Sequence, residues 1–193
     1  MRVARRARFP RSHSPGRLLG LVASDMPGHT LQHVGAEARL VAADGGAAIV
    51  VSEKVERRFL GRTEVARFHV SAAAPPGGPG LVRVRHTGRV RRQGIEAVMV
   101  KGDQVESRLA SALGSDTRFG AALLPLDFTV FEVTRSEGRW LGTVELMGAS
   151  YVSIALPPMR SYVRLHRDQA EALVGALSAL SAVLGDHGVT ADG

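Results

Sequence analysis

The sequence contains no cysteine, which removes several kinds of chemistry at once. A chain without cysteine has no disulfide, no thiolate metal ligand and no cysteine nucleophile. Its only lysines are Lys54 and Lys101, so arginine carries nearly all of the positive charge. Aromatic residues make up only 5% of the chain. Because aromatic rings commonly stack on the bases of single-stranded nucleic acids, this scarcity weakens a nucleic-acid interpretation.

Long apolar runs are missing as well. A helix needs roughly 20 mostly apolar residues to cross a membrane, and glycine, proline or charge interrupts every apolar stretch of this chain before that length. Near the N-terminus, the apolar run at 18–23 is too short for the core of a secretory signal. We therefore expect a soluble, cytoplasmic protein with no membrane span.

The common signatures of catalytic and cofactor sites are also missing. Gly148-Ala149-Ser150 lacks the second glycine of a G-x-S-x-G nucleophile elbow. The glycine clusters near positions 45 and 77 do not open a helix after a buried strand, so neither predicts a phosphate or dinucleotide site. We predict no cofactor. An enzyme whose site is assembled from scattered residues stays open as an alternative.

Histidines give little support for a metal site. His29 and His33 are the only pair with a spacing of four, and no third ligand lies nearby, so we expect solvated loop histidines and no metal. His69, His86 and His166 lie in or beside predicted regular elements and could act as general bases. The sequence supplies none of them with a nucleophile or an orienting carboxylate.

Positive charge is concentrated at the N-terminus. The 193 residues carry a formal net charge of +7, and six arginines precede the first acidic residue, Asp25. Residues 1–15 combine these arginines with prolines and serines and show no apolar periodicity, which predicts a basic, disordered arm. The arm therefore accounts for most of the net positive charge and for the high isoelectric point, and the rest of the chain is nearly neutral.

The body shows an alternation of strand and helix patterns. We predict a short helix around 18–25, strands at 39–42, 47–55, 62–71, 81–86, 95–100, 128–134 and 140–147, and an extended piece at 162–165. Asp103 and Glu106 form an acidic capping box that opens a helix ending near Gly114, and a second short helix follows to about 124. Residues 148–150 should break or bulge the chain. A long amphipathic helix begins near Arg167, with fraying from about 185.

This order of elements predicts an α+β fold. We expect a curved antiparallel sheet with helices packed on one face and a long C-terminal helix, forming one domain over 16–186 with a frayed tail at 187–193. The flanks of the last helix carry unusually small residues. They permit close packing against a second surface, such as a partner subunit in a homodimer, although an alanine-rich composition explains them equally well.

The strongest positive feature is a set of arginines on a predicted hairpin of 81–86 with 89–91. Strand alternation places Arg83, Arg85, Arg89 and Arg91 on one face, where their charges repel each other. Water and salt, a bound polyanion, or glutamates of adjacent strands must screen them; the candidate glutamates are Glu53, Glu56 and Glu64. These four arginines are our candidate anion-binding residues.

Three segments resemble a known family. Leu123-Leu124-Pro125-Leu126-Asp127-Phe128, Gly148-Ala149-Ser150 and Arg160-Ser161-Tyr162-Val163-Arg164-Leu165 together resemble a small bacterial family of uncharacterised proteins. The resemblance covers most of the chain beyond the arm. The resemblance implies membership of that class of protein. It implies no activity, and no functional residue can be assigned from it.

Three functions stay open at this point. The first is a non-catalytic binding or interaction module that uses a groove between helix and sheet. The second is a nucleic-acid or polyanion binder that uses the arm and the arginine hairpin. The third is an enzyme with an unrecognised site.

Overall fold

A computed structural model describes residues 14–34, 37–43, 48–59, 61–88 and 93–188. Its four helices are α1 (Arg17–Asp25), α2 (Gln104–Ser115), α3 (Thr117–Leu123) and α4 (Arg167–Gly188). Its nine strands are β1 (His29–Val34), β2 (Glu37–Ala42), β3 (Ile49–Arg58), β4 (Gly61–Ala73), β5 (Gly80–Thr87), β6 (Gly94–Lys101), β7 (Phe128–Ser136), β8 (Arg139–Ile154) and β9 (Met159–Val163). The fold is α+β, as predicted.

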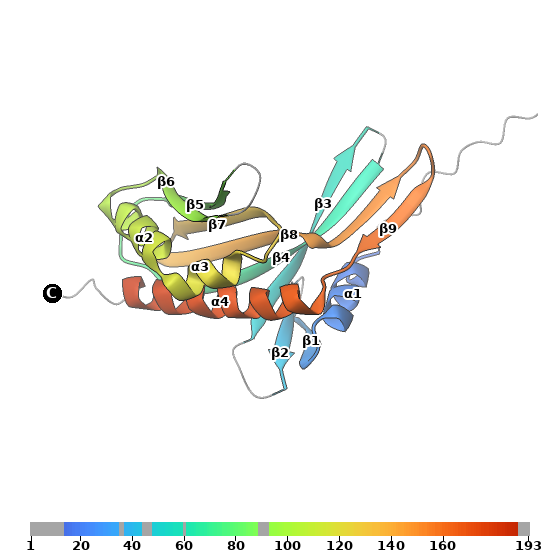
Figure 1. The fold of residues 1–193 in the computed structure, drawn as a ribbon, viewed down its shortest axis with the longest axis horizontal. Coiled ribbons are helices and arrows are strands. Elements are labelled where there is room, and N and C mark those ends of the chain that lie inside the picture. Colours follow the sequence, from blue (N-terminus) through green and yellow to red (C-terminus); the bar gives the residue numbers. More distant parts are fainter. Residues whose placement is uncertain (1–13, 35–36, 44–47, 60, 89–92, 189–193) are drawn as a thin grey trace, which may run out of the picture.

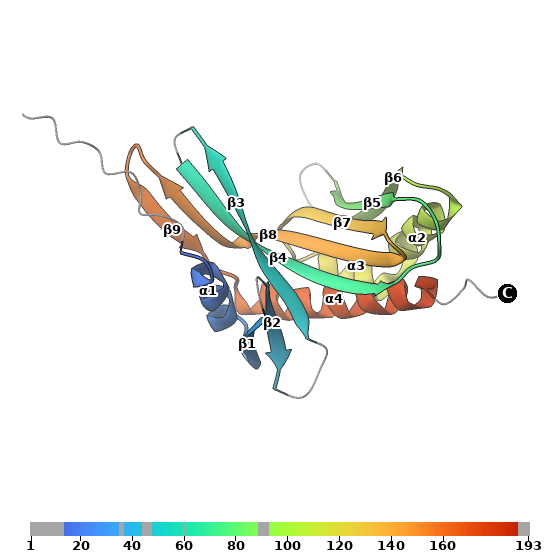
Figure 2. The same ribbon diagram turned by 180° about the vertical axis from the view of Figure 1, so that it is seen from behind.

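All nine strands join one antiparallel sheet that does not close. The order is β1-β2-β3-β4-β8-β7-β5-β6, and β9 pairs with the far end of β8. Figures 1 and 2 show a strongly twisted sheet with the helices on one side, α4 running along it, α2 and α3 near one end of α4 and α1 near the other. The predicted curved sheet with helices on one face is confirmed.

The two longest strands hold the sheet together and bend in the middle. β4 and β8 pair along most of their length, but their register shifts between Val65 and Arg67, opposite the segment that contains Ala149. Ala149 has a positive φ of 57°, which non-glycine residues adopt mainly in turns and bulges. The predicted irregularity at 148–150 is therefore a bulge. The strand does not end there, as the sequence suggested, but continues to Ile154.

The long helix α4 contributes one side of the hydrophobic core. Leu173, Leu177, Leu180 and Leu184 recur at helical spacing and are almost completely buried. Burying one such side chain contributes about 1.5–3 kcal/mol. Gly142 of β8 makes room for this packing, because a Cβ atom there would lie 2.5 Å from Cδ2 of Leu180.

The capping box of α2 is confirmed and is part of a larger buried cluster. The side chain of Asp103 accepts a hydrogen bond from the Val105 amide, and Glu106 accepts one from the Asp103 amide. Glu106 also pairs with Arg135 of β7, with 2.6 Å between Oε1 and Nε. Arg135 in turn contacts the carboxylate of Asp103 at 2.8 Å. These contacts fix the start of α2 against the sheet.

The small flank of α4 meets another helix of the same chain. Gly175 faces α3, where an added Cβ would lie 3.8 Å from Cβ of Ala122. Close approach of α3 thus accounts for part of the small-residue flank without a second subunit. The predicted homodimer stays a prediction.

Two elements differ from the sequence-based expectations. His29 and His33, expected in a loop, lie in strand β1, which pairs with β2 along its whole length. The helix α4 continues to Gly188, beyond the point where fraying was expected. The arm predicted over 1–15 lies outside the described residues up to position 13, as does the end of the tail at 189–193.

Candidate functional site

The structure describes only part of the predicted arginine hairpin. β5 pairs with β6, placing Arg85 opposite Glu96, and residues 89–91 lie outside the described residues. Arg83 pairs with Glu132 at 2.8 Å, and Arg85 with Glu96 at 2.9 Å. Carboxylates of adjacent strands therefore neutralise both charges.

The other members of this set give no further anion site. Arg89 and Arg91 lie outside the described residues. Two of the candidate glutamates have other partners: Glu53 binds the N-terminal amides of α1, and Glu64 pairs with Arg62. Within the described part of the chain, the sequence-predicted residues do not converge on an exposed basic cluster.

A polar surface covers the sheet face that points away from α4, which we call the open face. Ala66 and Phe68 of β4 are buried in the core, so strand alternation turns Arg67, His69 and Ser71 to the opposite side. The residues of neighbouring strands that share this face include Ser52, Lys54, Glu132, Thr134, Leu141, Thr143 and Glu145.

Three strands meet in a hydrogen-bonded cluster around His69 on the open face. Nε2 of His69 lies 2.7 Å from Oγ of Ser52 on β3, and Nδ1 lies 3.2 Å from Oγ1 of Thr143 on β8. Burial lowers the pKa of His69, an effect that the nearby Glu37 carboxylate partly opposes. The lowered pKa favours the neutral ring, in which one nitrogen donates a hydrogen bond and the other accepts one.

An ion-pair cluster lies beside this histidine. The buried carboxylate of Glu145 accepts from Nε of Arg67 at 2.6 Å and from Nζ of Lys54 at 3.3 Å. Lys54 also contacts Glu56 at 2.7 Å, and this contact raises the pKa of Lys54. Two cations and two carboxylates balance here, so the cluster orders the open face without giving it a strong net charge.

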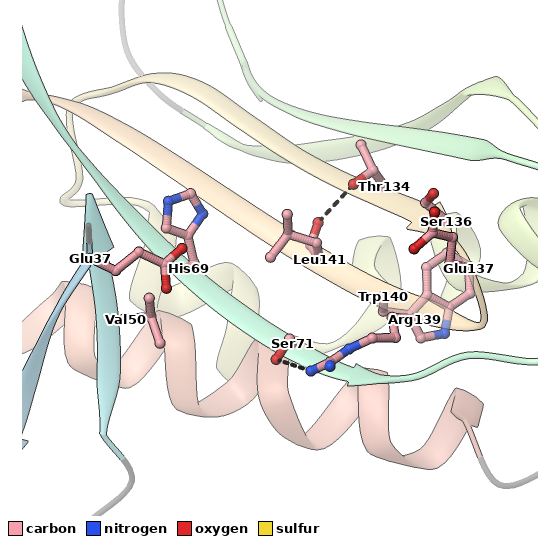
Figure 3. A pocket seen from close by; sticks show the side chains of 10 residues that line it. All are labelled: Glu37, Val50, His69, Ser71, Thr134, Ser136, Glu137, Arg139, Trp140 and Leu141. Carbon is pink, nitrogen blue, oxygen red and sulfur yellow. Dashed lines mark hydrogen bonds between the residues drawn. The ribbon is translucent and has the colours of Figure 1, made fainter. Parts of the chain in front are cut away.

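A hollow of about 360 Å³ adjoins His69 on the open face (Figure 3). We call it the open-face hollow. Its lining combines apolar side chains with hydroxyls and charges; among them are Val50, His69, Ser71, Thr134, Arg139 and Leu141. Arg139 donates a hydrogen bond to Oγ of Ser71 at 3.1 Å, a contact drawn in Figure 3.

A second depression lies on the helix side of the same strands, and we call it the α4 groove. One part, of about 470 Å³, lies between α4 and the strands β2, β3 and β4. The other part, of about 450 Å³, lies between α4 and the segment 26–29. Both parts are lined by His29 and Val174, so they adjoin. The groove meets the open-face hollow at Val50, His69 and Ser71, which line both.

The end of the groove near α1 is fixed by a buried carboxylate. Asp25, the last residue of α1, accepts hydrogen bonds from Tyr162, from the guanidinium of Arg164 and from the Leu165 amide. Burial raises the pKa of Asp25, but these hydrogen bonds outweigh it and hold the pKa below its usual value. This junction ties α1 to the segment that leads into α4.

Other sequence candidates have structural roles. Ser150, in the motif that lacked a second glycine, is buried and donates to the Met147 carbonyl within the bulge. His86 stacks on Phe128 and donates to the Leu123 carbonyl at 3.2 Å. Among the described residues, no three histidine or acidic side chains gather where they could hold a metal ion. No helix in the described ranges is long and apolar enough to cross a membrane.

The comparisons with known proteins give a family and no activity. Residues 24–184 match the family described as "Protein of unknown function (DUF3156)", and the chain belongs to this family. No curated protein and no solved structure shows a significant match to the chain.

Sequence reasoning missed the cluster of Ser52, His69 and Thr143. The three residues come from three strands, and only the strand register brings them together. In this register β3 and β4 pair from Val50 opposite His69 to Arg58 opposite Gly61. The α4 groove was expected in kind, since a helix packed on a curved sheet often leaves such a groove.

Proposed function

We propose that this protein is a binding module that holds a small amphipathic molecule in the α4 groove. The observation that carries the proposal is the groove itself, which has an apolar lining and polar groups from both walls. This combination is typical of small-molecule sites, where apolar contacts supply affinity and a few polar groups fix orientation.

One wall of the groove is a continuous stripe of α4. The stripe has helical spacing and consists of Arg167, Ala170, Glu171, Val174, Leu177, Ser178 and Ser181. Its apolar members lie in the middle, with the Arg167–Glu171 ion pair at the N-terminal end and serine hydroxyls towards the C-terminal end. Such an arrangement suits a molecule with an apolar body and polar ends.

The opposite wall comes from the sheet and from the segment after α1. Ala42, Ile49 and Val70 add apolar surface, and His29 adds an imidazole ring. The wall is built on β2, β3 and β4, whose pairing holds these residues in place. A rigid wall supports binding, because less conformational freedom is lost when the ligand docks.

The polyanion alternative has less support. Arg83 and Arg85 each have a carboxylate partner, so their charges are already compensated. The arm and Arg89 and Arg91 lie outside the described residues, and a contribution from them stays a prediction. The cytoplasmic location, the bacterial origin and a homodimer through α4 also stay predictions.

The test compares a substitution that narrows the groove with a control substitution on the same helix outside the groove. Ser178 and Ala182 are both small, exposed residues of α4, but only Ser178 lines the groove. We expect Ser178→Phe to weaken binding of the amphipathic dye 1-anilinonaphthalene-8-sulfonate by roughly tenfold or more, a loss of about 1.4 kcal/mol. Ala182→Phe should leave the affinity unchanged. Fluorescence titration of the folded variants measures both, and equal affinities in the two variants would refute the proposal.

A further inference from the structure

We propose that Ser52 is an activated nucleophile with His69 as its general base, and that the pair attacks neutral carboxylic esters bound beside it in the open-face hollow, which His69 lines. This activity goes beyond ligand binding in the α4 groove and rests on the contact between Ser52 and His69 on the other face of the sheet. It starts from the 2.7 Å distance between Ser52 Oγ and His69 Nε2. A serine becomes a useful nucleophile when an adjacent base removes its proton.

The tautomer of His69 follows from its two partners. If Nδ1 carries the proton, it donates to Thr143 Oγ1, and the Nε2 lone pair then accepts the hydroxyl proton of Ser52. Thr143 thus orients the ring and takes the place that the aspartate has in a Ser-His-Asp triad. Burial lowers the pKa of His69 and so favours the neutral ring, in which this nitrogen carries a lone pair.

Three adjacent strands hold this arrangement. In the sheet register, His69 lies between Val50 of β3 and Thr143 of β8, and Ser52 lies opposite Arg67. Positions fixed by strand pairing are held more firmly than positions on loops. Ser52 remains partly exposed, and Arg67, which lies opposite it, is held in place by its ion pair with Glu145.

The reaction is an acyl transfer. Ser52 Oγ bonds to the carbonyl carbon of the ester while its proton passes to His69 Nε2. The bond to the leaving alcohol breaks, and the alcohol takes the proton from His69. A water molecule then attacks the acyl-serine, its proton passes through His69, and the free acid leaves with Ser52 restored.

The lining of the hollow indicates the charge of the substrate. Glu37 and Glu137 place two carboxylates around it, against the single guanidinium of Arg139. Figure 3 shows Glu37 near His69, and Glu137 and Arg139 towards the other end. An anionic ester would be repelled by this excess of negative charge, whereas a neutral ester with a small acyl group would rest on Val50 and Leu141.

The test uses diisopropyl fluorophosphate, a neutral reagent that modifies activated serines. Intact mass and peptide mapping of the full chain should show one adduct, at Ser52, and Ser52→Ala should abolish it. His69→Gln should slow labelling by roughly a hundredfold, as expected for loss of a general base. The matched control is Ser71→Ala, since Ser71 lines the same hollow but bonds to Arg139, and it should label at the wild-type rate.

A second variant keeps the test decisive if His69→Gln fails to fold. Thr143→Val preserves the side-chain shape and removes the acceptor for Nδ1, so labelling should slow by about tenfold. Ser178→Phe, which narrows the α4 groove, should label normally, so this proposal and the binding proposal can fail separately. Absence of a Ser52 adduct on the folded wild-type chain, or labelling that does not respond to the His69 and Thr143 substitutions, would overturn the inference.

Discussion

Arg135 and Glu106 form an ion pair inside the protein, with 2.6 Å between Nε and Oε1 and side-chain exposures of 1% and 0%. The pair connects β7 to the first turn of α2, and Gly80 and Gly102 leave space for the glutamate. An ion pair at such depth loses its hydration, so removing one partner leaves an uncompensated buried charge.

We expect Glu106→Ala to lower the free energy of unfolding by about 3–5 kcal/mol, the range for breaking a buried pair. The exposed pair Arg167–Glu171 is the control, with side-chain exposures of 80% and 65%. Glu171→Ala should cost about 0.5 kcal/mol or less. Urea denaturation measures both, and equal losses would show that the buried pair does not stabilise the start of α2.

Because Gly142 lies close to Leu180, we expect alanine substitutions at Gly142 and at Gly20 to change stability in opposite directions. Gly142→Ala should destabilise by about 1–3 kcal/mol, because the added methyl group meets a fully packed side chain. Gly20→Ala, inside α1 and with open space around it, should stabilise by about 0.4–1 kcal/mol. Thermal unfolding of the two variants gives the signs, and a stabilising Gly142→Ala would contradict the packing described for α4.

Asp25 makes stability depend on pH in the acid range. Its pKa is lowered in the folded state relative to about 3.9 in an unfolded chain, so the unfolded chain binds more protons there. The stabilisation is therefore present above that value and is lost as the pH falls through the folded pKa. The stability difference between wild type and Asp25→Asn should be large at pH 7 and shrink below about pH 4. A difference that stays constant across this range would exclude the carboxylate as the source.

The neutralised arginines predict the behaviour of the protein on a polyanion column. Glu96→Gln combined with Glu132→Gln frees Arg85 and Arg83, and retention on heparin should increase and persist to higher salt. Replacing both arginines by Gln should change wild-type retention little. A large loss of retention in the arginine variant would instead support a polyanion site on this hairpin.

The fold could be predicted well wherever local patterns decide it. The capping box at Asp103 and Glu106 and the leucine spacing of α4 are local signals, and both elements formed where expected. Strand β1 was missed because its exposed, polar sequence lacks clear alternation and follows Pro27-Gly28. The end of β8 was missed because a bulge at 148–150 resembles a strand end when the pairing partner is unknown.

The candidate sites depend on long-range pairing, which explains what the sequence did not show. Ser52 and His69 become neighbours only through the register of β3 and β4, and Thr143 joins them from a strand 74 residues further along. The partners of Arg83 and Arg85 depend in the same way on the order β7-β5-β6. Residue types alone indicated possible bases and cations, and strand order determined what each one contacts.

The most direct test of the binding account is a ¹H–¹⁵N chemical-shift map of the full chain titrated with 1-anilinonaphthalene-8-sulfonate. The account predicts saturable shifts at amides that line the α4 groove, including Val174, Ser178 and Ile49, with small shifts at Glu96 and Glu132 on the far part of the open face. Saturable shifts confined to residues outside the groove, or no saturable shift in the folded protein, would contradict it.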